Sequence, residues 1–157
     1  MKTNQILTSI ITPLKLSTQE ILDIYQLADL PMTEARLTSL LHDEKDRDFK
    51  LCSFEELGAF LDGLILAKRG PSPSKAKNDV VIPLTNNLIL KKLRIALELK
   101  EPETEIIFSL GEAELSRQEL KSLFRKEDHK NFRACSDDLL MAFLEGVDEY
   151  YYDGPEV

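Results

Sequence analysis

The sequence predicts an all-α protein built from two tandem helical repeats of about four helices each, packed as one pseudo-symmetric body. The first observation is a pair of similar segments, EKDRDFKLCSFEELGAFLDG (residues 44–63) and EDHKNFRACSDDLLMAFLEG (residues 127–146). The second is that apolar residues recur at helical spacing in both copies. The third is that Ser or Thr, often followed by Glu three positions later, precedes most of these apolar runs.

The duplication extends well beyond these two stretches. A shift of 83 positions places Asn4 on Asn87 and Gly63 on Gly146 without a gap. Many aligned positions are identical, and many others are apolar in both copies; identical pairs include Ile6/Ile89, Leu7/Leu90, Leu37/Leu120, Cys52/Cys135, Phe60/Phe143 and Leu61/Leu144. A fixed internal period of this kind indicates a repeat architecture.

Each expected helix has its own signal. The first helix of each copy shows one apolar face, although Pro13 predicts a kink or an early end in copy one. The second begins at the capping box Ser17-Thr-Gln-Glu20, and in copy two with Pro102 in the first turn. The third and fourth helices are expected to begin at four further capping residues, which are Thr33, Ser116, Ser53 and Ser136.

The repeats divide the chain into four parts. Copy one covers residues 1–66, a basic connector rich in Pro, Ser and Lys covers 67–86, copy two covers 87–148, and a tail covers 149–157. Each copy has about 65 residues, a length at which a separate core is marginal. We therefore expect the copies to pack on each other about a pseudo-twofold axis.

Composition excludes several classes of protein. The 157 residues are 43% hydrophobic and include no apolar run of the roughly 18 residues that a membrane-spanning helix needs. Two cysteines give neither a disulfide framework nor a metal cluster. We expect a cytoplasmic protein with reduced thiols and no cofactor.

Three stretches resemble a known family: NNLILKKLRIALELK (86–100), FLDGLILAKRG (60–70) and RKEDHKNFRACSDDLLMAFLEG (125–146). They are similar to the signatures of the YehS-like family of small bacterial proteins, domain of unknown function 1456, which carries two tandem copies. The resemblance covers nearly the whole chain. It implies a soluble cytoplasmic bacterial protein of helical repeats, and it transfers no activity to any residue.

The common catalytic motifs are absent from the sequence, so we do not predict an enzyme or identify a small-molecule substrate. One alternative is a cysteine-dependent activity that uses Cys135 with His129. The repeat weighs against it, because copy one keeps Cys52 but has Asp46 in place of the histidine. The cysteines are more simply read as small core residues.

Charge points to one surface. The net charge is −8, yet residues 67–100 carry eight basic and two acidic side chains. The second and third helices of copy two also have helix-turn-helix proportions, with Arg117, Lys121 and Arg125 expected on the outer face of the third helix. The candidate binding residues are Lys68, Arg69, Lys91, Lys92, Arg94, Arg117, Lys121 and Arg125.

The sequence therefore favours a non-catalytic interaction or regulatory protein that binds a protein partner or associates with itself. Nucleic-acid binding through the helix-turn-helix-like unit and the basic face of copy two is the alternative. The overall acidity opposes that alternative, because phosphates are repelled by a negatively charged protein.

Overall fold

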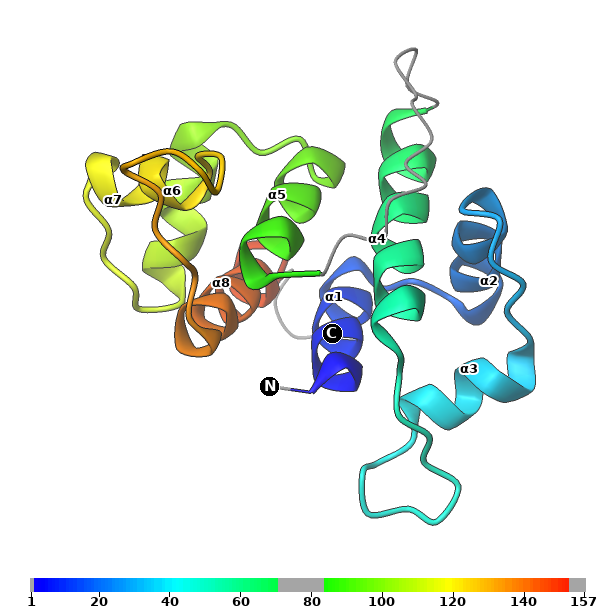
Figure 1. Cartoon of the computed structure of the whole chain (residues 1–157). Helices are drawn as coiled ribbons and strands as arrows, with labels where there is room; N and C mark the ends of the chain where they lie inside the picture. The colour runs from blue at the N-terminus through cyan, green and yellow to red at the C-terminus, as the bar shows by residue number, and fades with distance from the viewer. Residues whose placement is uncertain (1, 71–83, 153–157) are drawn as a thin grey trace.

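The computed structural model describes residues 2–70 and 84–152, and within those ranges it contains eight α-helices and no strand. Copy one comprises α1 (Thr3–Leu14), α2 (Thr18–Leu27), α3 (Glu34–Leu41) and α4 (Phe54–Arg69). Copy two comprises α5 (Asn86–Ala96), α6 (Glu101–Leu110), α7 (Arg117–Leu123) and α8 (Asp137–Tyr150) (Figure 1). The predicted all-α fold of two four-helix repeats is confirmed.

Most of the predicted connector, residues 71–83, lies outside the described residues. None of the helices in the described ranges has the length and apolarity needed to cross a membrane.

Several helices begin at the capping residues that the sequence predicts. The Ser17 hydroxyl accepts a hydrogen bond from the Glu20 amide at 3.1 Å, and the Glu20 carboxylate accepts one from the Ser17 amide at 2.8 Å. The same reciprocal box opens α4 at Ser53 and α7 at Ser116. Each box satisfies amides that the first turn of a helix leaves without a backbone partner.

The early end that Pro13 predicts for the first helix does not occur. Pro13 lies in the last turn of α1, and the helix continues to Leu14. The residue after the helix, Lys15, has a φ of 54° and adopts the left-handed backbone conformation. The equivalent residue of copy two, Glu98, has a φ of 55°. The two copies therefore share one way of ending this helix.

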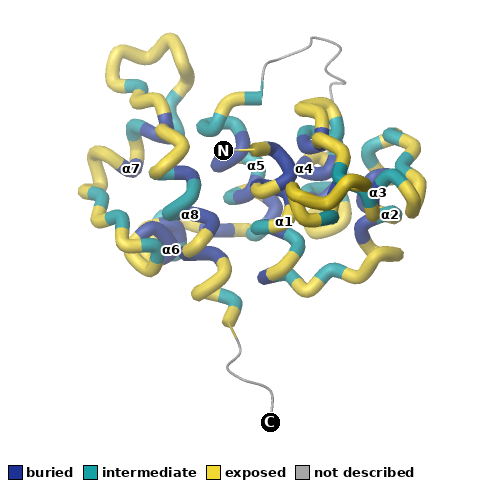
Figure 2. Tube along the Cα trace, turned by 90° about the horizontal axis from the view of Figure 1, so that it is seen from below, coloured by how far each residue is buried: buried dark blue, intermediate teal, exposed yellow. Residues whose placement is uncertain are grey.

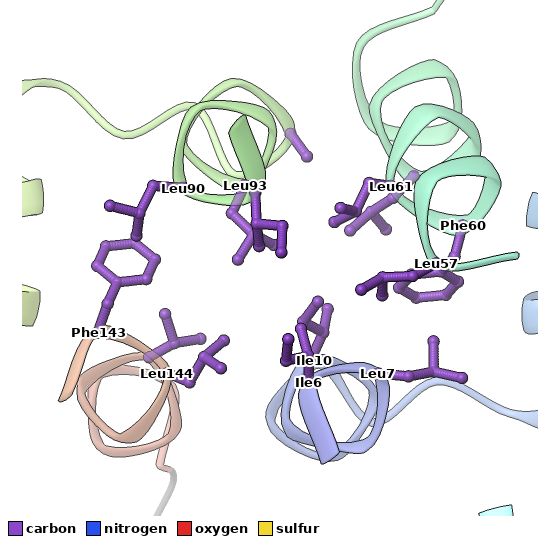
Figure 3. Close-up of a cluster of buried hydrophobic side chains, with 14 of the residues drawn as sticks. Ile6, Leu7, Ile10, Leu57, Phe60, Leu61, Leu90, Leu93, Phe143 and Leu144 are labelled. Carbon is purple, nitrogen blue, oxygen red and sulfur yellow. The ribbon is translucent and has the colours of Figure 1, made fainter. Parts of the chain in front are cut away.

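The first helix of each copy packs chiefly on the last helix of the other copy. Helix α1 lies on α8 and α5 lies on α4, while α2 covers α4 and α6 covers α8. Figure 3 shows side chains from all four central helices pointing into one core, among them Ile10, Leu61, Leu93 and Leu144. Figure 2 shows the buried residues concentrated along these helices, with the loops exposed. This exchange of first helices gives the body its pseudo-twofold symmetry.

A glycine allows the last helix of each copy to approach the second helix closely. A methyl group on Gly63 would lie 2.0 Å from the Ile24 carbonyl oxygen, and one on Gly146 would lie 1.8 Å from the Ile107 carbonyl oxygen. Both distances are far shorter than a carbon–oxygen contact can be, so only glycine fits. The same pair of positions makes the same contact in each copy.

An asparagine at the start of each first helix holds the loop before the last helix. Asn87 Nδ2 donates to the carbonyls of Leu123 and Arg133 at 3.0 and 2.8 Å, and Asn87 Oδ1 accepts from the Cys135 amide at 2.8 Å. Asn4 makes the same three bonds in copy one. One side chain thus satisfies three backbone groups, which fixes each loop on its own first helix.

Candidate binding surfaces between the two copies

The cysteine and histidine considered for catalysis are built into a loop. Cys135 is 6% exposed, and burial raises the pKa of its thiol to about 11. His129 Nδ1 accepts a hydrogen bond from the Asn131 amide at 2.9 Å, as the Asp46 carboxylate does from the Asp48 amide at 2.9 Å. His129 and Asp46 therefore close the same turn in the two copies. A thiol with a raised pKa holds little thiolate near neutral pH and is a poor nucleophile.

Four of the eight predicted binding residues lie on α4 and α5, two helices that pack on each other. Arg69, in the last turn of α4, donates from Nη1 to the Ile95 carbonyl of α5 at 3.2 Å. Lys92 of α5 forms an ion pair with Asp62 of α4. We call this set the α4–α5 basic surface, and its members are Lys68, Arg69, Lys91 and Lys92.

Two predicted binding residues support the interior of copy two. Arg94 donates from Nε to the Leu99 carbonyl at 3.0 Å, and its guanidinium carbon lies 4.6 Å from the centre of the Phe124 ring. Arg125 lies beyond the end of α7, is only partly exposed and has a buried Nε. The expectation that Arg125 extends the outer face of the third helix is therefore wrong, because that helix ends at Leu123.

The remaining two, Arg117 and Lys121, are exposed on α7. Figure 1 places α7 on the far side of α5 from the end of α4, so these two do not join the α4–α5 basic surface. Residues 111–116 separate α6 from α7, which is longer than the three or four residues of a helix-turn-helix turn. The eight residues thus fall into three places on the molecule.

A cleft of about 460 Å³ lies at the pseudo-twofold axis, and the sequence did not predict it. Equivalent residues of both copies line it, namely Thr3 with Asn86 and Ile6 with Ile89. Phe54 of copy one and Phe132 of copy two also line it. The only sequence signal for this cleft is that Thr3 and Asn86, and likewise Ile6 and Ile89, occupy matching positions in the repeat. Knowing that they meet requires the packing of α1 beside α5.

These features define a class: an all-α protein in which two tandem copies exchange first helices and share one core. The chain belongs to the family described as Protein of unknown function (DUF1456), whose model matches residues 3–70 and 86–151. It is 35% identical over 147 residues to the Uncharacterized protein YehS of Escherichia coli (strain K12), and the match covers 94% of each chain. No solved structure matches the chain. The predicted family and its duplication are confirmed.

Proposed function

We propose that this chain is a non-catalytic binding protein that recognises an acidic segment of a partner protein through the α4–α5 basic surface. The observation that carries the proposal is the position of these cations beside exposed aliphatic side chains. Ile95 is 39% exposed next to Arg69, and Leu27 is 49% exposed at the end of α2, which packs on α4. Cations around apolar side chains suit an amphipathic acidic segment.

Two of the four charges of this surface are available to a partner. Lys68 and Lys91 are exposed and form no ion pair with any of the residues that the structure describes. In a chain of net charge −8, such a surface steers acidic groups to one place while the rest of the molecule repels them. The proposal includes a cytoplasmic location, which is supported by two buried cysteines that are not joined in a disulfide.

Nucleic-acid binding is the second candidate. Exposed Arg117 and Lys121 on α7 favour it, because they could contact phosphates. Their distance from the α4–α5 basic surface weighs against a continuous track for a nucleic-acid backbone (Figure 1).

Fluorescence anisotropy with two labelled probes tests the proposal. The probes are a synthetic amphipathic peptide of glutamate and leucine and a single-stranded RNA of mixed sequence. We expect the peptide to bind, and the triple variant K68E/R69E/K91E to weaken that binding by at least about tenfold, as loss of several charge contacts does. The control K45E/R47E/K50E makes the same charge change in the loop before α4, at the other end of that helix (Figure 1), and should change binding less than about twofold.

Each other outcome decides the question. Binding of RNA with a steep loss on adding salt would support the second candidate instead. Equal weakening by both triple variants would show that only net charge matters, and the absence of peptide binding would overturn the proposal.

A further inference from the structure

A second groove between the copies lies at the helix pair that the repeat relates to α4 and α5. It has a volume of about 510 Å³ and runs between α1 and α8, with the end of α6 closing it. Hydroxyl side chains of α1 form one wall and carboxylates of α8 form the other. We call it the α1–α8 groove, and these wall residues are Thr8, Ser9, Thr12, Glu145, Asp148 and Glu149.

Comparison of the two copies shows what is unusual about this groove. The repeat relates Ser9 to Lys92 and Glu145 to Asp62. On the α4–α5 side, the ion pair between Lys92 and Asp62 spans the two helices. On the α1–α8 side, Ser9 is uncharged and too short to reach across to α8. Glu145 therefore has no equivalent of the lysine that pairs with Asp62. This groove is acidic, and none of the described residues that line it is basic.

Large apolar side chains stand exposed beside these carboxylates. Leu110 lines the groove and is 43% exposed, and Ile106, one turn earlier on the same side of α6, is 49% exposed. Exposed aliphatic side chains next to one another indicate a site of protein contact more often than isolated ones do. The groove therefore offers an apolar strip along α6 and a negative strip along α8.

We propose that the α1–α8 groove binds a basic amphipathic helix of a partner protein. The leucine-like face of that helix covers Ile106 and Leu110, and its lysine or arginine side chains reach Glu145, Asp148 and Glu149. The acidic residues of α8 are three and four positions apart, which matches the spacing of side chains on one face of a bound helix. A nucleic acid does not fit this groove, because its phosphates meet only carboxylates and hydroxyls.

A labelled synthetic amphipathic peptide of lysine and leucine is the probe, measured by anisotropy near physiological salt, where long-range attraction to the acidic chain is screened. We expect E145Q/D148N/E149Q to weaken binding by at least about tenfold. The control E34Q/D48N/E55Q removes the same charge from exposed positions of copy one and should change binding less than about twofold.

The apolar strip is tested by a second matched pair. L110S should weaken binding several-fold, whereas L27S, its equivalent in copy one, should not. Circular dichroism checks that every variant keeps its helices. Equal weakening by the two charge variants, equal weakening by the two serine variants, or no binding would each overturn the proposal. The variant K68E/R69E/K91E should bind this peptide as the parent does, so failure at the α4–α5 basic surface leaves this test unaffected.

Discussion

Tyr25 and Phe108 occupy the same place in the two copies and differ by one hydroxyl group. Each ring packs on the matching phenylalanine of the last helix, with centroids 5.9 Å apart for Tyr25 and Phe60 and 5.0 Å for Phe108 and Phe143. Tyr25 is fully buried, and its hydroxyl has no hydrogen-bond partner among the residues that the structure describes. This burial raises the pKa of the phenol above its usual value. Phe108 of copy two shows that the same core position packs without the hydroxyl.

We therefore expect Tyr25→Phe to raise the free energy of unfolding by about 1 kcal/mol, since an unsatisfied buried polar group costs about 1–3 kcal/mol. Urea denaturation followed by circular dichroism measures the change. The reciprocal variant Phe108→Tyr should lower stability. A loss of stability in Tyr25→Phe would mean that the hydroxyl has a stabilising role that its geometry does not show.

At the scale of the helix, local chemistry made the starts predictable, while tertiary contacts set some ends. Capping boxes lie within four residues, so Ser17 and Ser116 could be identified from the sequence. The end of α7 could not be. The carbonyls of Ser122 and Leu123 accept hydrogen bonds from the Arg133 amide and the Asn87 side chain, partners that are remote in sequence. Those bonds replace the ones that would have carried the helix through Arg125.

The close approach of α6 and α8 predicts a large effect of one methyl group. Gly146→Ala should lower the free energy of unfolding by about 3 kcal/mol or more, because overpacking against a backbone carbonyl forces the helices apart. Gly58 of α4 is the matched control, since a methyl group there would meet nothing within 4 Å. Gly58→Ala should leave stability unchanged or raise it by up to about 1 kcal/mol through helix propensity. Chemical denaturation measures both. Equal effects would contradict the close contact.

An ion pair between α3 and α4 predicts how stability depends on pH. Arg36 donates to both carboxylate oxygens of Glu56, each at 2.9 Å, and this contact is the main reason that the pKa of Glu56 lies below its usual value of 4.5. A lowered pKa in the folded state means that the contribution to stability is present above about pH 4.5 and is lost as pH falls below it.

The variant Glu56→Gln should therefore lose stability at pH 7 and show a shallower loss between pH 5 and pH 3 than the parent, because glutamine has no carboxylate to protonate over this range. Thermal melts across this range measure both effects. Glu55→Gln, at the exposed neighbouring position, should keep the slope of the parent. An unchanged slope in Glu56→Gln would show that the ion pair contributes nothing to acid unfolding.

At the scale of the molecule, the duplication was visible in the sequence and the exchange of first helices was not. Periodicity shows which face of a helix is apolar, but Ile6 and Ile10 fit a partner from either copy equally well. The separation of the basic residues was also not visible in the sequence, because it depends on which helices pack together. Arg94 is close in sequence to Lys91 and Lys92, yet its guanidinium packs on the Phe124 ring. Arg117 carries the same charge but lies on α7, away from the α4–α5 basic surface.

Exchange of first helices predicts that neither copy folds alone. Without its partner, copy one would expose the sides of α1 and α4 that face α8 and α5, including Ile10 and Leu61, and a chain of about 60 residues has little stability to spare. We expect residues 1–70 and residues 84–157, expressed separately, to show weak helical circular dichroism at low concentration. Mixing them should restore the helical signal and reach a plateau at a ratio of one to one. Any structure in a single fragment should grow with concentration, because only a second copy can supply the missing helix. A monomeric fragment with a cooperative unfolding transition that is independent of concentration would contradict the shared core.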